Sequence, residues 1–181
     1  MLQIINEHMG TYIGVLLLGI GEIVFAKVSL DKPITTNKFM TFVILILTAL
    51  ACTIISINMT GMTKTLSICI VHVFEFKLLF NLSYHKSIFL TFIYMTLIIG
   101  LELIQLLFAT NIIGLSKDYC YNDFAGSFVG NVTTCISLLV ITLVSKNILR
   151  KLTNAKLETN TKITIYLIVI FSLFCVKIIT R

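Results

Sequence analysis

Apolar runs of about twenty residues, separated by short polar connections, follow one another along this chain. The run at 39–57 contains no charged residue. A helix of about 20 apolar residues crosses the roughly 30 Å hydrocarbon layer of a bilayer. The pattern predicts an all-α fold, a polytopic transmembrane helix bundle of about six helices that forms a single membrane domain over residues 1–181. The expected spans are about 9–28, 39–57, 65–82, 88–108, 125–144 and 163–179.

The composition supports a membrane protein. Of the 181 residues, 57% are hydrophobic and 12% are charged, whereas an average soluble domain carries about 25% charged residues. The net charge of +6 does not indicate a nucleic-acid partner, because the basic residues lie between apolar runs and do not cluster on one soluble face. We therefore expect the lipid bilayer as a partner and no nucleic acid.

The charges between the apolar runs predict an orientation. Basic residues outnumber acidic ones in the first, third and fifth connections, whereas the fourth connection and the N-terminus are acidic. Because Lys and Arg beside membrane spans are retained in the cytoplasm, we expect the N-terminus outside the cell. Six spans would also place the C-terminus outside, which suggests that a further span and a cytoplasmic domain are missing. The basic residues in or beside the first, third and fifth connections are Lys27, Lys32, Lys38, Lys77, Lys86, Lys146, Arg150, Lys151, Lys156 and Lys162.

Five ionisable residues fall within the expected spans. An ionisable side chain in a span costs about 2.5–3.5 kcal/mol on insertion scales, so each needs a partner or a water-filled cavity. His72 and Glu75 are three residues apart and share one helix face, where they could hydrogen-bond. Glu22 and Lys77 are expected at similar depths and are a plausible interhelical pair. Pairing and snorkelling are the favoured interpretation, and a proton or ion relay through Glu75 and His72 is an alternative.

A ligand pocket is the third interpretation of these polar residues. Glu102 and Gln105 are expected in the outer half of the fourth span, beneath a polar loop, so the two parts could form a mouth that binds an extracellular peptide. Tyrosines at a membrane boundary also form an ordinary interfacial belt, which is the favoured explanation of the two tyrosines in this loop. The loop residues of the expected mouth are Asp118, Tyr119, Tyr121 and Asp123.

Sequence signatures of catalysis are absent. The chain has no phosphate-binding glycine loop, no His-Glu-x-x-His pair and no Gly-x-Ser-x-Gly turn. Its five cysteines form no Cys-x-x-Cys pair. We therefore expect no enzymatic activity, no cofactor and no metal site. The Gly10-x-x-x-Gly14 spacing would allow another helix to approach closely, as in a homodimer or a complex with a membrane partner, but it is too common to establish one.

The segment VHVFEFKLLFNLSYHKSIFLTFIYMTLIIGLELIQLL, residues 71–107, resembles the third and fourth spans of the N-terminal sensor region of Gram-positive peptide-pheromone receptor histidine kinases, which act in quorum sensing. The residues that match the family pattern are Lys77, Phe80, Lys86 and Glu102. The stretch SKNILRKLTNAK is similar to a cytoplasmic turn of that family. The chain departs from the family in lacking the phosphorylated histidine and the ATP-binding domain, because none of its three histidines occupies a suitable position.

The resemblance implies a sensor or receptor module in a bacterial cell membrane, with multiple spans. Such a module would bind an extracellular signal such as a peptide and relay it to a cytoplasmic kinase part that this chain lacks. Two alternatives are a substrate-binding membrane subunit of a transporter and an inactive truncated remnant. The expected outward C-terminus argues against transport, because a transporter subunit must dock on an energising partner in the cytoplasm.

Overall fold

The computed structural model describes residues 2–116, 119–120 and 124–154, and these residues are helical apart from short connections. No strand occurs among them. The expected sixth span at 163–179 lies outside the described residues. The elements in chain order are α1 (Leu2–Leu30), α2 (Lys38–Asn58), α3 (Gly61–Phe80), α4 (Tyr84–Phe108), the π-helical turn η1 (Ala109–Ile113), α6 (Phe124–Val144) and α7 (Lys146–Asn154).

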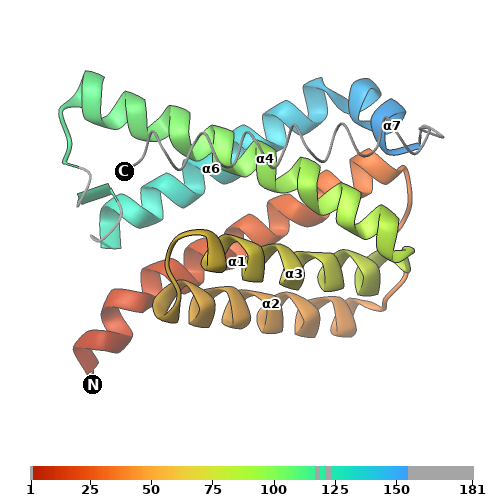
Figure 1. Cartoon of the computed structure of the whole chain (residues 1–181), viewed down its shortest axis with the longest axis horizontal. Coiled ribbons are helices and arrows are strands. Elements are labelled where there is room, and N and C mark those ends of the chain that lie inside the picture. Colours follow the sequence, from red (N-terminus) through yellow and green to blue (C-terminus); the bar gives the residue numbers. More distant parts are fainter. Residues whose placement is uncertain (1, 117–118, 121–123, 155–181) are drawn as a thin grey trace.

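The helices form one bundle in which α1 makes the most extensive contacts with other helices. Its most extensive contact is with α6, and it also touches α2, α4 and α7. The helices α2 and α3 lie side by side and antiparallel, and α4 packs against the other flank of α3 (Figure 1). Glu22 of α1 meets His72 and Glu75 of α3 in the space between these two helices.

The two ends of the bundle differ in charge. The α1–α2 connection, the α3–α4 turn and the start of α7 lie at one end, on the right of Figure 1, where the Thr35 amide donates to the Leu79 carbonyl at 2.9 Å. The α2–α3 turn, η1 and the start of α6 lie at the opposite end, which we call the open end. We call the first the basic end, because the α1–α2 connection, the helix turns that flank this connection and the α3–α4 turn, and α7 contain eight basic residues. They are Lys27, Lys32, Lys38, Lys77, Lys86, Lys146, Arg150 and Lys151.

Local sequence explains where the helices begin and end. Asn37 caps α2, because its side-chain oxygen accepts a hydrogen bond from the Met40 amide at 2.8 Å. Asn81 ends α3 in the left-handed conformation, with φ of 47°, which is a common way to close a helix. Asp31 follows α1 with φ of 52°. Each of these residues has a short polar side chain that tolerates its position.

Small residues on α1 allow α6 to approach closely. A Cβ atom on Gly14 would lie 2.2 Å from Asn131 Nδ2, and one on Gly21 would lie 3.2 Å from Cys135 Sγ. A side chain at Gly14 would therefore displace Asn131 or separate the two helices. The Gly10-x-x-x-Gly14 spacing was considered above as a surface for a second molecule. At Gly14 this surface packs against α6 of the same chain.

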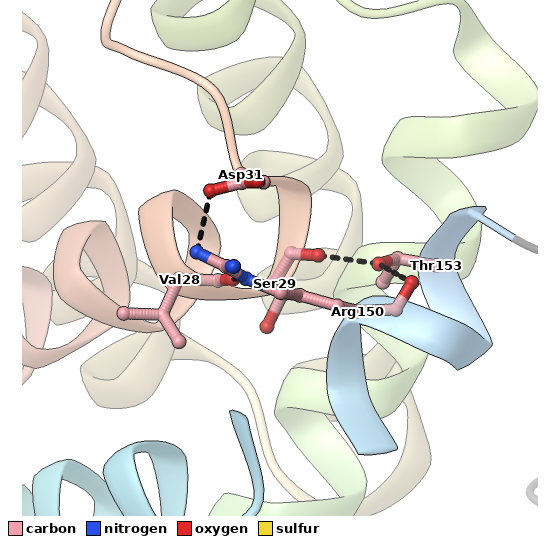
Figure 2. Close-up of polar contacts among 5 residues, drawn as sticks. All are labelled: Val28, Ser29, Asp31, Arg150 and Thr153. Carbon is pink, nitrogen blue, oxygen red and sulfur yellow. Dashed lines mark hydrogen bonds and ion pairs between the residues drawn. The ribbon is translucent and has the colours of Figure 1, made fainter. Parts of the chain in front are cut away.

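A set of polar contacts joins α7 to the end of α1 (Figure 2). Arg150 Nε donates to the Val28 carbonyl at 3.1 Å, and the Arg150 guanidinium forms an ion pair with Asp31. The Thr153 hydroxyl hydrogen-bonds to the Ser29 carbonyl. The last carbonyls of a helix have no partner within it, and a cation is favoured beside them. The helix α7 therefore completes the C-terminal end of α1.

The bundle buries a few charged residues within its apolar core and exposes large apolar residues on its surface. Glu22, His72 and Glu75 are buried, whereas large apolar side chains are exposed at helical spacing on the outer faces of α2, α3 and α6. A soluble domain rarely buries such charges, and extended exposed apolar surface marks contact with a membrane or another protein. These exposed residues include Leu47, Ile54, Leu66, Ile70, Phe74, Leu78, Val129, Ile136, Val140 and Leu143.

Three described helices are long and apolar enough to cross a membrane, namely Tyr12–Leu30, Lys38–Asn58 and Tyr84–Ile113. A fourth is added if α6 and α7, which meet at a bend of 79°, count as one broken span. The composition of α3, which overlaps the expected span 65–82, does not meet this criterion. The expected bundle of about six spans is therefore supported for three to four helices in the described part of the chain.

Candidate functional site

A buried cluster of ionisable side chains lies between α1 and α3. His72 Nδ1 is 2.9 Å from Glu22 Oε1 and 3.2 Å from Glu75 Oε2. The expected contact between His72 and Glu75 is confirmed, and it follows from their spacing of three residues on one helix. Only 1% of Glu22, 7% of His72 and 2% of Glu75 is exposed. We call these three residues the carboxylate–histidine cluster.

The expected pair between Glu22 and Lys77 is wrong. Glu22 contacts His72 instead, and the Lys77 ammonium group lies 3.2 Å from the centre of the Tyr84 ring. Lys77 belongs to the last turn of α3, and Tyr84 begins α4, so both lie at the basic end. A cation over a tyrosine ring is attracted by the ring's π electrons, and a long lysine stem can place its charge near the end of its helix. Lys77 therefore does not neutralise the cluster.

Aromatic side chains enclose the cluster. The Tyr94 ring packs edge-on against the His72 ring, with 5.3 Å between their centroids, and also against Phe25 and Phe76. The buried Cys52 thiol lies beside the same histidine. Tyr94 and Cys52 were not predicted as site residues. Their side chains are ordinary constituents of an apolar run, and only the packing of α2 and α4 against α3 brings them to His72.

Several oxygen atoms in the core of the bundle lack a hydrogen-bond partner among the described residues. In the cluster, Glu22 Oε2 and Glu75 Oε1 have neither a hydrogen bond nor an ion pair with a described residue, and Glu22 Oε1 has only its ion-pair contact with His72. A buried polar atom without a partner is unfavourable, and each instance in a folded protein calls for an explanation. The cluster thus has more acceptor oxygens than the surrounding protein satisfies.

A cavity of about 1480 Å³ extends from the cluster towards the open end. Its lining includes Glu22, His72 and Glu75 at one side and Lys64 and Tyr119 at the other. None of the residues at the basic end lines it. The described part of the expected ligand mouth and three of the four residues of the expected pairing group therefore line one cavity. They are Glu102, Gln105 and Tyr119 of the mouth, and Glu22, His72 and Glu75 of the pairing group.

The residues of the expected ligand mouth have different surroundings. Glu102 is exposed and Gln105 partly buried, and both line the cavity. Gln105 is also bonded to α6, because its amide group lies 2.9 Å from the Thr134 hydroxyl. Tyr119 is exposed at the rim. The three remaining residues lie outside the described part of the chain, and they are Asp118, Tyr121 and Asp123.

The charge of the cavity lining is acidic. Three glutamates line it, Glu22, Glu75 and Glu102, against the single basic side chain of Lys64 among the described residues. Such a lining favours a ligand that carries a positive charge, such as an amine, a basic peptide or a metal cation.

Comparison with known proteins does not indicate a function, because no protein-family model, curated protein or solved structure matches the chain.

Proposed function

We propose that this chain is a multi-pass protein of a bacterial cell membrane, with the basic end in the cytoplasm and the open end outside. Two observations support this proposal. The outer faces of the helices are apolar, while the carboxylate–histidine cluster is buried. Eight of the nine Lys and Arg residues in the described part of the chain lie at the basic end, and Lys64 is the exception. This separation matches the retention of cations on the cytoplasmic side.

In this proposal α3 also crosses the bilayer. Its 20 residues correspond to a length of about 30 Å, which equals the hydrocarbon thickness. The charges that lower its average hydropathy do not face lipid. His72 and Glu75 are buried, Lys64 lines the cavity, and Lys77 belongs to the last turn. The outward stripe of α3 is apolar and consists of Leu66, Ile70, Phe74 and Leu78.

The helix α7 fits a position along the cytoplasmic surface of the membrane. It turns 79° away from α6. Leu149 is buried against the bundle, whereas Lys146 and Lys151 are exposed. A short helix with an apolar face and lysines on the other face lies in the plane of the interface. This placement puts α7 where a cytoplasmic partner can reach it.

The function we propose is that of a sensor or receptor module. An extracellular ligand, such as a peptide with a positive charge, enters the cavity from the open end and contacts its acidic lining. The observation that carries this proposal is the continuity of α1, which contributes Glu22 to the cavity and holds α7 through its last carbonyls. A ligand that shifts or rotates α1 would therefore move α7, which would relay the change to a cytoplasmic kinase part.

Loss of the Arg150 side chain tests the link between α1 and α7. The variant Arg150→Ala removes the bond to Val28 and the ion pair with Asp31, so we expect faster trypsin cleavage at Lys151. Global stability should fall by only about 0–1 kcal/mol, because this ion pair is partly exposed to solvent. The control is Lys32→Ala, which removes an exposed cation next to Asp31 in the α1–α2 connection. Equal cleavage rates in both variants would show that Arg150 does not hold α7.

Access to the cavity tests the receptor proposal. In a chain whose native cysteines are replaced by alanine, Glu102→Cys places a thiol on the exposed part of the cavity lining. A membrane-impermeant maleimide should label this thiol on intact spheroplasts. In the matched control Lys32→Cys, the thiol at the basic end should react only after the membrane is permeabilised.

The same labelling experiment distinguishes a receptor from a transporter subunit. Buried carboxylates within a bundle also occur in transporters, which makes transport the second candidate. A transporter alternates its access, so Glu102→Cys would then be labelled from outside and also in inside-out vesicles. A receptor cavity would be labelled from outside alone. Labelling from the cytoplasmic face alone would contradict both the orientation and the receptor proposal.

A further inference from the structure

The carboxylate–histidine cluster directs two carboxylates at one ring nitrogen. Oxygen atoms of both Glu22 and Glu75 approach the same ring nitrogen, His72 Nδ1, at 2.9 and 3.2 Å. A ring nitrogen carries at most one hydrogen, so it can form one good hydrogen bond and not two. The outer oxygens, Glu22 Oε2 and Glu75 Oε1, have no partner among the described residues.

We propose that this cluster binds one divalent first-row transition-metal ion, with His72 Nδ1 and one oxygen each of Glu22 and Glu75 as ligands. These atoms lie within 4.8 Å of one another. Two ligand atoms that each lie about 2.1 Å from one ion are roughly 3.0–3.4 Å apart at tetrahedral or octahedral angles. The observed separations of His72 Nδ1 from the two carboxylates are close to this range.

The charge of the cluster supports a divalent ion. Metal-bound carboxylates are ionised and metal-bound histidine is neutral, so the three ligands contribute two negative charges. A divalent cation cancels them, and the buried site becomes neutral overall. Lys77, the basic side chain expected from the sequence to pair with Glu22, is held over Tyr84. The ion would therefore supply the positive charge that the surrounding helices lack.

The ligand types indicate which class of metal would bind. An imidazole nitrogen favours zinc and neighbouring transition metals over magnesium or calcium, which prefer all-oxygen sites. Three protein ligands leave at least one position open towards the cavity that they line. Catalytic and ligand-binding zinc sites share this open position, whereas structural zinc sites are closed. A water molecule or a donor group of the cavity ligand would complete the coordination.

Zinc binding to the purified full chain in detergent tests the proposal. After treatment with a chelator, the wild-type protein should take up one Zn²⁺ per chain in equilibrium dialysis. The variants Glu22→Gln, His72→Gln and Glu75→Gln should bind Zn²⁺ at least about 10–100-fold more weakly, because the loss of a group that only hydrogen-bonds to a metal ligand already has an effect of this size. The matched control is Glu102→Gln, an acidic residue of the same cavity outside the cluster, and its affinity should not change.

X-ray absorption of the zinc-loaded wild type provides a test that does not depend on variants, in case these fail to fold. A shell of nitrogen and oxygen ligands with an imidazole contribution is expected. Sulfur-dominated coordination would place the ion on cysteines and overturn the proposal. A folded wild type that takes up far less than one ion per chain would also overturn it, and would leave the cluster as a site for protons only. Neither measurement depends on the membrane orientation or on the receptor function proposed above.

Discussion

Reporter domains inserted into the loops are expected to alternate between the two sides of the membrane. A fluorescent protein that folds only in the cytoplasm should be bright after Lys32 and after Leu82, and dark after Met59 and after Ser116. Alkaline phosphatase, which is active only outside, should give the opposite pattern. The physical reason is the separation of charge, because moving the basic end across the bilayer would require the transfer of many Lys and Arg side chains. At each insertion site, one reporter should give its full signal and the other only background.

The positions after Met59 and Leu82 form the sharpest comparison, because they differ only by α3. Opposite signals would show that α3 crosses the membrane, although its average composition does not meet the criterion that α1, α2 and α4 satisfy. Equal signals at these two positions would mean that α3 enters and leaves on one side, and that the proposed orientation fails from α4 onward. The insertion after Lys32 is the control for the orientation of α1.

Local features of the fold were predictable from the sequence. The uncharged run 39–57 nearly coincides with α2, whose ends are at Lys38 and Asn58. The contact between His72 and Glu75 was also predictable, because the geometry of a single helix fixes the relation of residues three apart. These features depend only on hydrophobicity along the chain and on helical periodicity.

Contacts between helices were not predictable in the same way. The sequence indicated the approximate depth of Glu22 but not the rotation of α1 about its axis, and this rotation directs Glu22 to His72 instead of Lys77. The bond between Gln105 and Thr134 likewise depends on how α4 crosses α6. Sequence patterns indicated the polar residues of the cluster and those near the open end. Only the packing of the helices showed that one cavity joins the described members of the two groups.

The helix α7 was not predicted, although its sequence contains a pattern that is typical of a helix. Its basic residues were used only to orient the chain, as part of a cytoplasmic turn. At helical spacing, Ile148 and Leu149 of this segment fall on one side, and Lys146, Arg150 and Lys151 fall on the other. The apolar and basic residues therefore occupy different faces of a short helix. An examination of helical periodicity in this segment could have predicted the helix, but not its attachment to the last carbonyls of α1.

Removal of the His72 side chain is expected to destabilise the metal-free protein strongly. His72→Ala leaves Glu22 and Glu75 buried together without the ring that lies between them. Breaking a buried ion pair by deleting one partner costs about 3–5 kcal/mol, because the remaining charge has no compensation. The measurement is the free energy of unfolding in mixed micelles. The matched control is His85→Ala, which removes an exposed histidine at the basic end and should change stability by less than about 0.5 kcal/mol.

A second substitution separates the loss of charge balance from the loss of packing. The His72 ring also packs against Tyr94, so His72→Ala removes apolar contact as well as a polar group. If unbalanced carboxylates cause most of the loss, adding Glu22→Gln to His72→Ala should restore a large part of the stability, because one of the two acidic groups is removed without a change of shape. If packing dominates, the double variant should be no more stable than His72→Ala. Recovery would establish that the interior of this bundle is organised around charge compensation, whereas its absence would identify His72 as a packing residue of the core.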